Sequence, residues 1–582
     1  MTRYSPCRLK ATVPCRILYG LAKESSPDMS SNMLLYGDNA LWLPRLPDEC
    51  ADMIYLDPPF KSDQVYNAIY GGDDPLLNAQ IQAFDDTWRW NSKVEEKFRA
   101  DLDAGVFPED LEDQMRVWYR RLVLTKAQVK KKDQTARESL MAYLVAMAPR
   151  LVEMKRILRP GGAIYLHCDD SADAYLRHLL DALFTESGFR NELIWKRTSA
   201  HNDPKRFGRI HDVIFYYCKS GGEVTWNPQC QPYDPEYVKK FYKYDDGDGR
   251  GPYWRDNLTA PGVSNGDAGE PWRGIDVSAI SRHWSAPREA CEQLGLPKDM
   301  PTRQKLDAID AAGMIYWPDK PGGMPCRKSY LKDKKGVPAQ DVILDIPPLK
   351  AWSAERLGYP TQKPRALLDR LILSSTNPGD LVVDPFAGCF TSIESAEANG
   401  RRWIGIDITY QGIAMAIDRL GKLEGCSDYR VLGSPTELSA AAALAEESKR
   451  QFQEWVVLGL LSRYHAIPSP SQGADGGIDG VIPLRPLMGS LDKDRDRCIV
   501  SVKGGKPKAL DVDEIIGSVT RHKAQMGMLV LLSQPTREMV KRADAAGRYT
   551  AGDGKTYPRI QIATVETLMN GTTDDDPELP GF

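Results

Sequence analysis

Asp57, Pro58, Pro59 and Phe60 are consecutive residues whose types suit one particular reaction. The exocyclic amine of a nucleic-acid base is a poor nucleophile, because its lone pair is delocalised into the ring. A carboxylate and a rigid backbone carbonyl can free this lone pair by accepting hydrogen bonds from both N–H groups, and Asp57 and Pro58 supply these acceptors. Phe60 can stack on an extruded base. The motif indicates activation of an amino group, although in isolation it is equally consistent with an ordinary turn.

A second motif, Asp384-Pro385-Phe386-Ala387-Gly388-Cys389-Phe390-Thr391, is typical of a loop that approaches a ligand. It follows the apolar run 381–383, and Gly388 allows the backbone to come close to a bound molecule. Asp407 ends the next strand-like segment roughly 20 residues later, the offset at which a carboxylate meets ribose hydroxyls in nucleotide-binding folds. The loop lacks the GxGxxG pattern of a dehydrogenase. The alternative interpretation is a generic turn between a strand and a helix.

Alternating strand and helix patterns must position these two motifs. Strands are expected at 33–36, 52–56, 163–167, 192–195, 212–218, 381–383 and 403–408, and helices at 40–46, 138–158, 175–183, 365–374, 391–399 and 413–423. This alternation predicts an α/β fold with a mainly parallel sheet covered on both faces. Ligands bind at the carboxyl ends of such strands, and both motifs fall there.

The composition bounds the class of protein. A chain of 582 residues requires two or three domains. The formal net charge of -4 excludes a uniformly basic nucleic-acid binder but not a local basic groove. The 11 cysteines form no CxxC pair, so neither a zinc site nor a disulfide framework is expected, and a reducing cytoplasm fits. No apolar run is long enough to span a membrane.

Together these residues resemble the beta class of DNA amino-methyltransferases, which includes the modification subunits of type III restriction systems. In that class the catalytic motif precedes the cofactor motif and a recognition domain lies between them, as in this chain. The resemblance covers roughly residues 33–425. It implies a Rossmann-like, S-adenosylmethionine-dependent methyltransferase with an inserted target-recognition domain. Further matches to the class are GDN at 37–39, FDDTW at 84–88, LHCDD at 166–170, NELIW at 191–195 and YPTQKP at 359–364.

The resemblance also implies roles for individual residues. The catalytic residues would be Asp57, Pro58, Pro59 and Phe60, which hold the flipped base while its amine attacks the sulfonium methyl group in line. The implied contacts with S-adenosyl-L-methionine are Asp38 at the adenine, Asp407 at the ribose, Asp384, Phe386 and Gly388 at the methionine end, and Thr361 and Lys363 in the motif that closes over the cofactor.

Departures from the class leave parts of this interpretation open. Phe390 stands where members usually carry a small residue, commonly glycine, so its side chain would either point away from the cofactor or crowd it. Asp57 in place of serine favours adenine N6 over cytosine N4. Methylation at cytosine C5 is disfavoured, because it requires an activated cysteine and the Pro-Cys pairs at Cys7, Cys15 and Cys326 follow no core strand.

Residues 225–350 interleave arginine with aromatic residues, and they lack a long periodic helix. Such side chains suit phosphate contacts, base-edge readout and the filling of the gap left by a flipped base. The alternative is a small hydrophobic core built on tryptophan and tyrosine. The residues concerned are Tyr253, Trp254, Arg255, Trp272, Arg273, Arg282, His283 and Trp284.

The C-terminal region, residues 445–570, resembles the PD-(D/E)xK nuclease fold, in particular the Mrr-like restriction endonucleases. Asp479 and Lys503 match its metal-binding and catalytic positions, and Asp475 would help to hold Mg²⁺. Ser501 stands where members carry Glu or Gln, which removes one strong ligand. Compensation would have to come from Asp475, or from Asp511, Asp513 and Glu514. A smaller α/β domain kept for DNA binding, with weak or no cleavage, is therefore favoured over an active nuclease.

These inferences give a domain plan and a function. A flexible tail is expected at 1–28, the methyltransferase domain at 29–430 with an insertion at about 61–135 and a recognition region at about 220–350, the nuclease-like domain at 445–570, and an acidic tail at 571–582. The expected function is site-specific methylation of adenine N6 in double-stranded DNA, in the prokaryotic cytoplasm or nucleoid. The expected partners are a second copy or a restriction subunit, and no membrane. The alternatives are cytosine N4 methylation, a bifunctional restriction-modification protein that also cleaves DNA, and a non-catalytic DNA-binding subunit.

Overall fold

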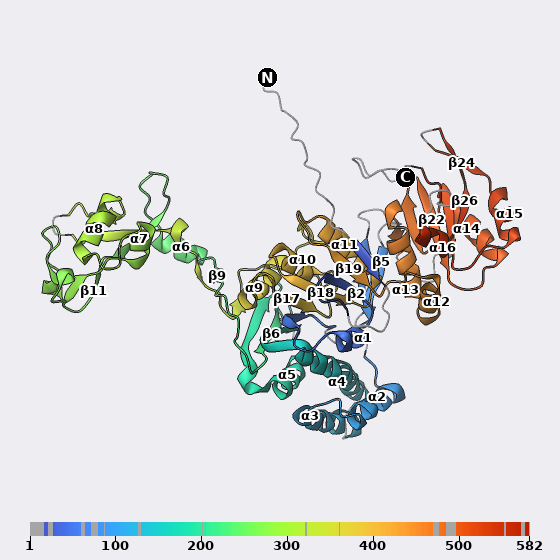
Figure 1. Ribbon diagram of the computed structural model, residues 1–582, viewed down its shortest axis with the longest axis horizontal. Coiled ribbons are helices and arrows are strands. Elements are labelled where there is room, and N and C mark those ends of the chain that lie inside the picture. Colours follow the sequence, from blue (N-terminus) through green and yellow to red (C-terminus); the bar gives the residue numbers. More distant parts are fainter. Residues whose placement is uncertain are drawn as a thin grey trace. The chain divides into compact units, whose positions relative to one another are not determined.

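The computed structural model places most of the chain in two compact units, Met1–Asn227 with Asp341–Phe582 and Pro228–Gln340 (Figure 1). The residues that the structure describes are 27–59, 88–125, 130–200, 202–203, 205–320, 323–359, 361–469, 477–484, 496–551, 554–571 and 577–580, together with the backbone of 17–20, 65–70 and 79–85. Phe60 and Asp475 lie outside the described residues.

A ten-stranded sheet forms the centre of the first unit. Its order is β1 (Ile17–Gly20), β19 (Tyr429–Leu432), β2 (Asn32–Tyr36), β18 (Arg402–Asp407), β17 (Leu381–Asp384), β3 (Ala51–Leu56), β6 (Leu158–Cys168), β8 (His211–Cys218), β7 (Phe189–Lys196) and β16 (Val342–Ile343). Every neighbouring pair is parallel except the two that involve β8. The predicted α/β class with a mainly parallel sheet is confirmed.

Helices cover both faces of this sheet, as the continuous apolar strands require. The helices are α1 (Asn39–Trp42), α2 (Ser92–Asp103), α3 (Glu109–Tyr119), α4 (Lys131–Ile157), α5 (Asp173–Gly188), α9 (Arg365–Ser375), α10 (Thr391–Ala398) and α11 (Tyr410–Gly421). Met33 and Leu35 of β2 belong to the hydrophobic core that includes α3, α4 and α5, whereas Leu34 and Tyr36 belong to the core that includes α9, α10 and α11. Alternate side chains of β2 therefore pack into two separate hydrophobic cores, one on each face of the sheet.

The chain changes direction at the middle of the sheet. From β17 it continues to β18 on one side, and from β3 it continues to β6 on the other. The carboxyl ends of β17 and β3 therefore border the topological switch point, where open α/β sheets bind their ligands. Asp384 ends β17 and Asp57 directly follows β3.

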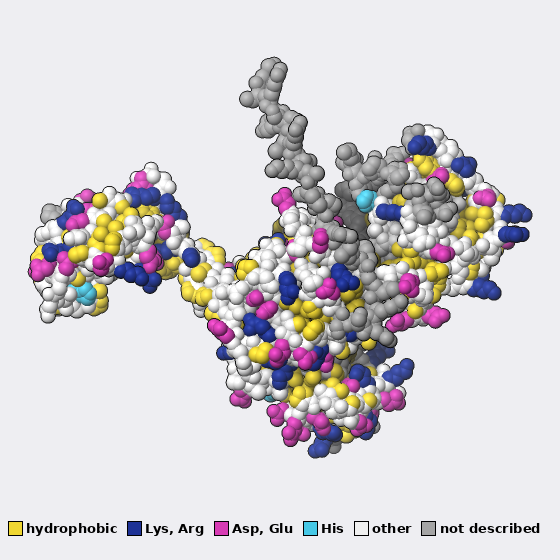
Figure 2. All heavy atoms as spheres, viewed as in Figure 1, with side chains coloured by type: hydrophobic (Ala, Val, Ile, Leu, Met, Phe, Trp, Pro, Cys, Tyr) yellow, Lys and Arg dark blue, Asp and Glu magenta, His cyan; other side chains and the backbone are white. Residues whose placement is uncertain are grey.

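The second unit, Pro228–Gln340, has its own small core. Its elements are β9 (Cys230–Gln231), α6 (Pro235–Phe241), β10 (Tyr253–Asn257), β11 (Thr259–Pro261), β12 (Arg282–Trp284), α7 (Arg288–Gln293), α8 (Thr302–Ala311), β13 (Ile315–Tyr316), β14 (Cys326–Tyr330) and β15 (Val337–Pro338). Trp272, Trp284 and Tyr253 are at most 3% exposed, so these three aromatic side chains build the interior of the unit. Figure 2 shows lysine and arginine side chains on its visible face, mixed with acidic ones.

The C-terminal part of the first unit carries a second, five-stranded sheet. Its order is β20 (Ile467–Pro468), β21 (Gly480–Pro483), β22 (Arg497–Lys503), β23 (Met526–Leu531) and β26 (Ile560–Thr564). The helices of this part are α12 (Leu438–Glu447), α13 (Lys449–Trp455), α14 (Ala509–Arg521), α15 (Arg537–Ala545) and α16 (Val565–Asn570), and a π-helical turn, Val456–Leu460, continues α13. Phe452 and Trp455 of α13 share one hydrophobic core with Tyr410 and Ile413 of α11.

Three details differ from the sequence-based expectation. Residues Ile17–Gly20, expected in a flexible tail, form the edge strand β1 beside β19. Tyr429–Leu432, expected at a domain boundary, is itself a strand of the large sheet. Leu579, expected in an acidic tail, is 3% exposed within the core. No helix among the described residues is long and apolar enough to cross a membrane.

Candidate functional site

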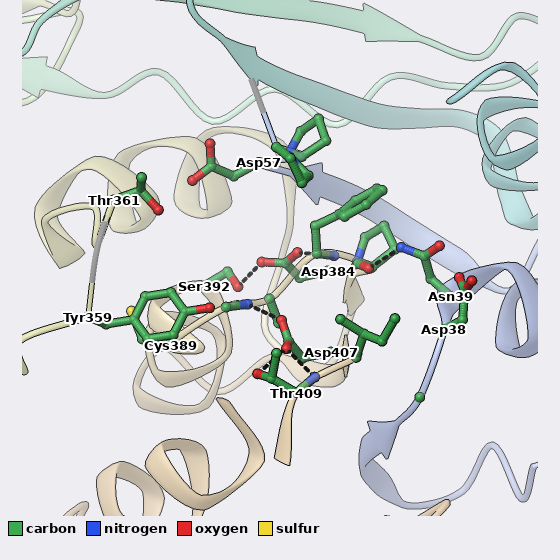
Figure 3. Close-up of a pocket in the computed structure, with 18 of the residues that line it drawn as sticks. Asp38, Asn39, Asp57, Tyr359, Thr361, Asp384, Cys389, Ser392, Asp407 and Thr409 are labelled. Atoms are coloured by element: carbon green, nitrogen blue, oxygen red, sulfur yellow. Dashed lines mark hydrogen bonds between the residues drawn. The ribbon is translucent and has the colours of Figure 1, made fainter. Parts of the chain in front are cut away.

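A cavity of about 460 Å³ lies at the carboxyl ends of β2, β18, β17 and β3 (Figure 3). This volume is in the range of small-molecule sites. The structure brings together in its wall every described residue to which the resemblance assigned a catalytic or cofactor-binding role. They are Asp38, Asp57, Pro58, Pro59, Thr361, Lys363, Asp384, Phe386, Gly388 and Asp407.

The carboxylate of Asp57 faces this cavity with one oxygen still available. Its Oδ2 accepts a hydrogen bond from Lys363 Nζ at 2.5 Å. Its Oδ1 is buried and has no hydrogen-bond partner among the described residues. A buried acceptor without a partner costs free energy, so its presence in a cavity points to a ligand donor. Lys363 also donates to the Thr361 carbonyl at 3.2 Å, and it thereby fixes the carboxylate beside the loop that follows Tyr359.

Asp384 anchors the glycine-containing loop that follows β17. Its Oδ1 accepts a hydrogen bond from the Phe386 amide at 3.0 Å, and its Oδ2 accepts one from the Ser392 hydroxyl. Burial, together with the neighbouring carboxylates of Asp57 and Asp407, raises the pKa of Asp384 to about 7. The cavity is therefore receptive to a positively charged ligand at this point.

Asp407 holds the other end of the same loop. Its Oδ2 accepts a hydrogen bond from the Gly388 amide at 2.8 Å, and its Oδ1 accepts from the amide and hydroxyl of Thr409 at 2.8 and 2.6 Å. Gly388 has a φ of +53°, and a Cβ there would lie 3.2 Å from the Tyr359 ring. Burial raises the pKa of Asp407 to about 6. A carboxylate has further lone pairs, so these bonds leave it able to accept from ligand hydroxyls.

Asp38 belongs to a network that the sequence analysis identified only in part. Its Oδ1 accepts hydrogen bonds from the Ala40 amide and from Arg150, both at 2.8 Å. Arg150 also donates to Asn39 Oδ1 at 2.6 Å, and Asn39 Nδ2 donates to the Pro385 carbonyl at 2.6 Å. Asn39 was part of the GDN match, but nothing in the sequence distinguished Arg150 from the other charged residues of a long helix. The network ties β2 to the loop after β17.

Phe390 does not line the cavity. Its side chain is 1% exposed and belongs to the core that includes α9, α10 and α11. A Cβ added to Gly405 of β18 would lie 2.6 Å from the ring of Phe390, so the ring occupies the space that the glycine leaves. Of the two orientations considered from the sequence, the structure has the one that points away from the expected cofactor. The backbone of Phe390 has a φ of +60°, a conformation that favours glycine.

The nuclease-like site of the C-terminal part has its acidic groups already occupied. Asp479 Oδ1 accepts from Gln453 Nε2 and its Oδ2 from the Val502 amide, each at 2.6 Å. Lys503 pairs with Glu514 at 3.1 Å and lies 3.8 Å from Asp511. Asp513 pairs with Arg542, and Ser501 is buried. Among the described residues, no group of three or more His, Cys, Asp or Glu side chains could hold a metal ion.

We predict that the full chain does not nick DNA when Mg²⁺ is added. Both oxygens of Asp479 already accept hydrogen bonds that join α13 to β22, and Ser501 has no carboxylate with which to bind a metal ion. The measurement is relaxation of supercoiled plasmid on a gel, with Asp479→Ala as the matched variant. Magnesium-dependent nicking that disappears in Asp479→Ala would contradict the prediction and establish a bifunctional protein.

Comparisons with known proteins match the methylase part and the nuclease-like part of the chain to two different families. A family described as DNA methylase matches residues 51–418, and one described as NACHT-associated inactive Restriction Endonuclease 1 matches residues 449–570. The type II methyltransferase M.EcaI of Enterobacter cloacae is 29% identical over 401 residues, which are 68% of this chain and 71% of that protein.

Two further curated relatives match smaller shares of their own length. The Mod subunit of the type III restriction-modification enzyme StyLTI of Salmonella typhimurium is 25% identical over 382 residues, 63% of this chain and 50% of that protein. The chain thus spans half the length of that relative. The DNA adenine methyltransferase YhdJ of Escherichia coli is 50% identical over 78 residues, 13% of this chain and 26% of that protein.

Proposed function

The chain belongs to the N6/N4 DNA methylase family, and from this premise we propose that it transfers a methyl group from S-adenosyl-L-methionine to the N6 amino group of adenine in double-stranded DNA. The observation that carries the proposal is the buried Oδ1 of Asp57, an acceptor without a described partner in the wall of the cavity. An amino group entering the cavity supplies the missing donor.

The described residues fit this cofactor and this reaction. When bound, the cofactor supplies an electrophilic methyl group on a positively charged sulfur. Asp384 places a buried carboxyl group where that charge would lie, Asp407 offers a carboxyl group to the ribose hydroxyls, and Gly388 leaves room for close approach. Asp57 and the Pro58 carbonyl hold the target amine, and Lys363 fixes the carboxylate in place. The chain thus acts mainly by positioning and by electrostatic stabilisation.

Adenine N6 is preferred over cytosine N4 for two reasons. Asp57 stands where the cytosine-modifying members of the beta class mostly carry serine. The similarity to the DNA adenine methyltransferase YhdJ also favours adenine. Methylation at cytosine C5 would need a thiolate, but burial raises the pKa of the Cys389 thiol, which lies in the cavity wall.

DNA would bind across the carboxyl edge of the large sheet. Phe207, in the loop after β7, is 98% exposed, and Trp352, in the segment after β16, is 81% exposed. Both strands are parallel to β3, so these aromatic side chains follow the same edge as Asp57. Pro228–Gln340 would serve as the target-recognition domain, with a second copy or a restriction subunit as protein partner. A cytoplasmic location fits a DNA substrate.

The proposal is tested by incubating the purified chain with methyl-labelled S-adenosyl-L-methionine and unmethylated DNA, then separating the nucleosides. Label in N6-methyladenine is the expected result. Label in N4-methylcytosine would show that the chain is an amino-methyltransferase whose target is cytosine and not adenine. Absence of label, with DNA binding intact, would favour a non-catalytic DNA-binding subunit.

We predict that affinity for S-adenosyl-L-methionine rises between pH 5.5 and 7.5. The pKa of Asp384 is raised to about 7, so below this value the carboxyl group is mostly neutral and must release its proton to face the sulfonium cation. The folding stability of the ligand-free protein should change in the opposite direction to the cofactor affinity. A raised carboxyl pKa contributes stability that is present at low pH and is lost as the pH rises through this pKa. Calorimetric titrations in buffers of different ionisation enthalpy measure the proton release.

The control for this prediction is S-adenosylhomocysteine, whose sulfur carries no charge. Its affinity should depend less on pH than that of S-adenosyl-L-methionine. Asp384→Asn should likewise flatten the dependence for the charged cofactor. Equal slopes for the two ligands would contradict the electrostatic role assigned to Asp384.

A further inference from the structure

The wall of the cavity includes residues of the nuclease-like part of the chain. Ser448, Arg450, Gln451 and Glu454 line it together with the methylase residues. Ser448 caps α13, its side chain accepting from the Gln451 amide at 3.3 Å. Residues 450, 451 and 454 are spaced so that they share one face of this helix. The adjoining side of the helix is apolar, with Phe452 and Trp455 at most 2% exposed.

The helix is held firmly against the methylase part. Gln451 Nε2 donates to the Ile408 carbonyl at 3.3 Å, one residue after Asp407. Phe452 and Trp455 belong to the same core as Tyr410 and Ile413 of α11. A Cβ added to Gly459, in the turn that continues α13, would lie 2.8 Å from the Tyr410 hydroxyl. Such close packing fixes the polar face of α13 toward the cavity.

The position of α13 identifies the part of the cofactor that it meets. The cavity runs from Asp57 at β3 through Asp384 at β17 to Asp407 at β18, which is the order from methyl acceptor to methyl donor to ribose in the proposed function. Ile408 and Thr409 lie beyond Asp407, and α13 lies against them. The adenosine end of the cavity is therefore the end that α13 closes.

The side chains on this face suit an adenine edge, which offers an amino donor and ring-nitrogen acceptors. Gln451, besides its bond to Ile408, has a second N–H and a carbonyl oxygen. Arg450 is 27% exposed and pairs with Glu454, which is 7% exposed, through a 2.8 Å bond from Nε to Oε1. Burial raises the pKa of Glu454, although the Arg450 charge opposes this. Donors and acceptors thus stand side by side.

We infer that the nuclease-like part forms one wall of the cofactor site, with Gln451 and Arg450 of α13 binding the adenosine portion of S-adenosyl-L-methionine. The inference rests on the proposed function, because it assigns contacts to that cofactor. It gives the nuclease-like fold a task that needs neither a metal ion nor DNA cleavage. These residues are binding residues that position the cofactor and take no part in the chemical step.

The test compares two glutamines of the same helix in the full chain. Gln451→Ala is expected to raise the Kd for S-adenosyl-L-methionine roughly 5- to 10-fold, the loss of about one hydrogen bond. Gln453→Ala, which removes the bond to Asp479 on another face, should leave the Kd unchanged. Gln451→Ala should also raise the Kd for S-adenosylhomocysteine by the same factor, because the two ligands share the adenosine portion. In turnover, KM for the cofactor should rise while kcat stays constant.

The outcomes separate this inference from the proposed function. If the unmutated chain binds neither ligand, the proposed function fails. If it binds both and Gln451→Ala and Gln453→Ala bind equally well, the inference is overturned and the proposed function stands. A loss in Gln451→Ala that is accompanied by a lower Tm than that of Gln453→Ala would be a packing effect, and it too would overturn the inference. Arg450→Ala provides a second, independent measurement of the same contact.

Discussion

Replacement of Asp57 by alanine is expected to abolish methyl transfer, by at least roughly 10³-fold in kcat, while the Kd for S-adenosyl-L-methionine remains close to that of the unmutated chain. Asp57 offers its free Oδ1 to the target amine, whereas the predicted cofactor contacts, apart from Thr361 and Lys363, lie at or just after the ends of β2, β17 and β18. Single-turnover transfer of labelled methyl groups to DNA measures the first quantity, and calorimetry measures the second.

Asp57→Asn is the sharper companion variant. Alanine removes the carboxylate that pairs with the ammonium of Lys363, which is only 7% exposed, so a loss of activity in Asp57→Ala does not by itself separate catalysis from stability. Asparagine can still accept from Lys363 through its oxygen, but it then presents an NH₂ group where Oδ1 faced the amine. We expect a folded and inactive protein. An active Asp57→Asn variant would remove Asp57 from the catalytic role.

Phe390→Ala is expected to destabilise the methylase part by about 3–5 kcal/mol, the usual cost of removing a buried phenylalanine side chain. The ring fills the space beside Gly405, and no other side chain can take it without rearrangement. The left-handed backbone of Phe390 costs about 1–2 kcal/mol for a residue with a Cβ. Phe390→Gly should therefore be about 1 kcal/mol more stable than Phe390→Ala, while both remain well below the unmutated chain. Thermal unfolding of the three proteins checks this order.

The cofactor affinity of the two Phe390 variants shows whether the phenylalanine ring only fills the core or also obstructs the cofactor. Because the ring points away from the cavity, neither variant should bind S-adenosyl-L-methionine more tightly than the unmutated chain at a temperature where all three are folded. Tighter binding by Phe390→Gly, without a fall in Tm, would mean that the phenylalanine obstructs the cofactor.

The sequence predicted the parts of the fold that local patterns determine. Apolar runs such as 212–218 are buried strands in the structure because a sheet covered on both faces needs continuous apolar residues, even in β8, which is antiparallel to its neighbours. The two resemblances, to DNA amino-methyltransferases and to restriction endonucleases, are confirmed by the family matches. Strand β19 escaped prediction because four residues, YRVL, carry too short a pattern to distinguish a strand from a loop.

The residues that sequence reasoning missed are those whose role depends on distant packing. The orientation of Phe390 is decided by the vacancy at Gly405, which becomes its neighbour only when β18 and α10 are assembled. Arg150 reaches Asp38 from the middle of α4, more than 100 residues away along the chain. Gln451 lies in a region that the sequence assigns to another domain, so no local motif connects it with the cavity.

The order of the strands also governs how the protein can be made. Asp52 of β3 accepts a hydrogen bond from the amide of Leu381, 329 residues later, and β2 is separated from its partner β18 by an even longer stretch of chain. At ribosomal rates of about 5–20 residues per second, β3 is synthesised tens of seconds before β17 can cover its edge. The Pro228–Gln340 unit, which is contiguous, can fold in that interval. During that interval the nascent methylase half exposes two apolar strand edges that could pair with other chains.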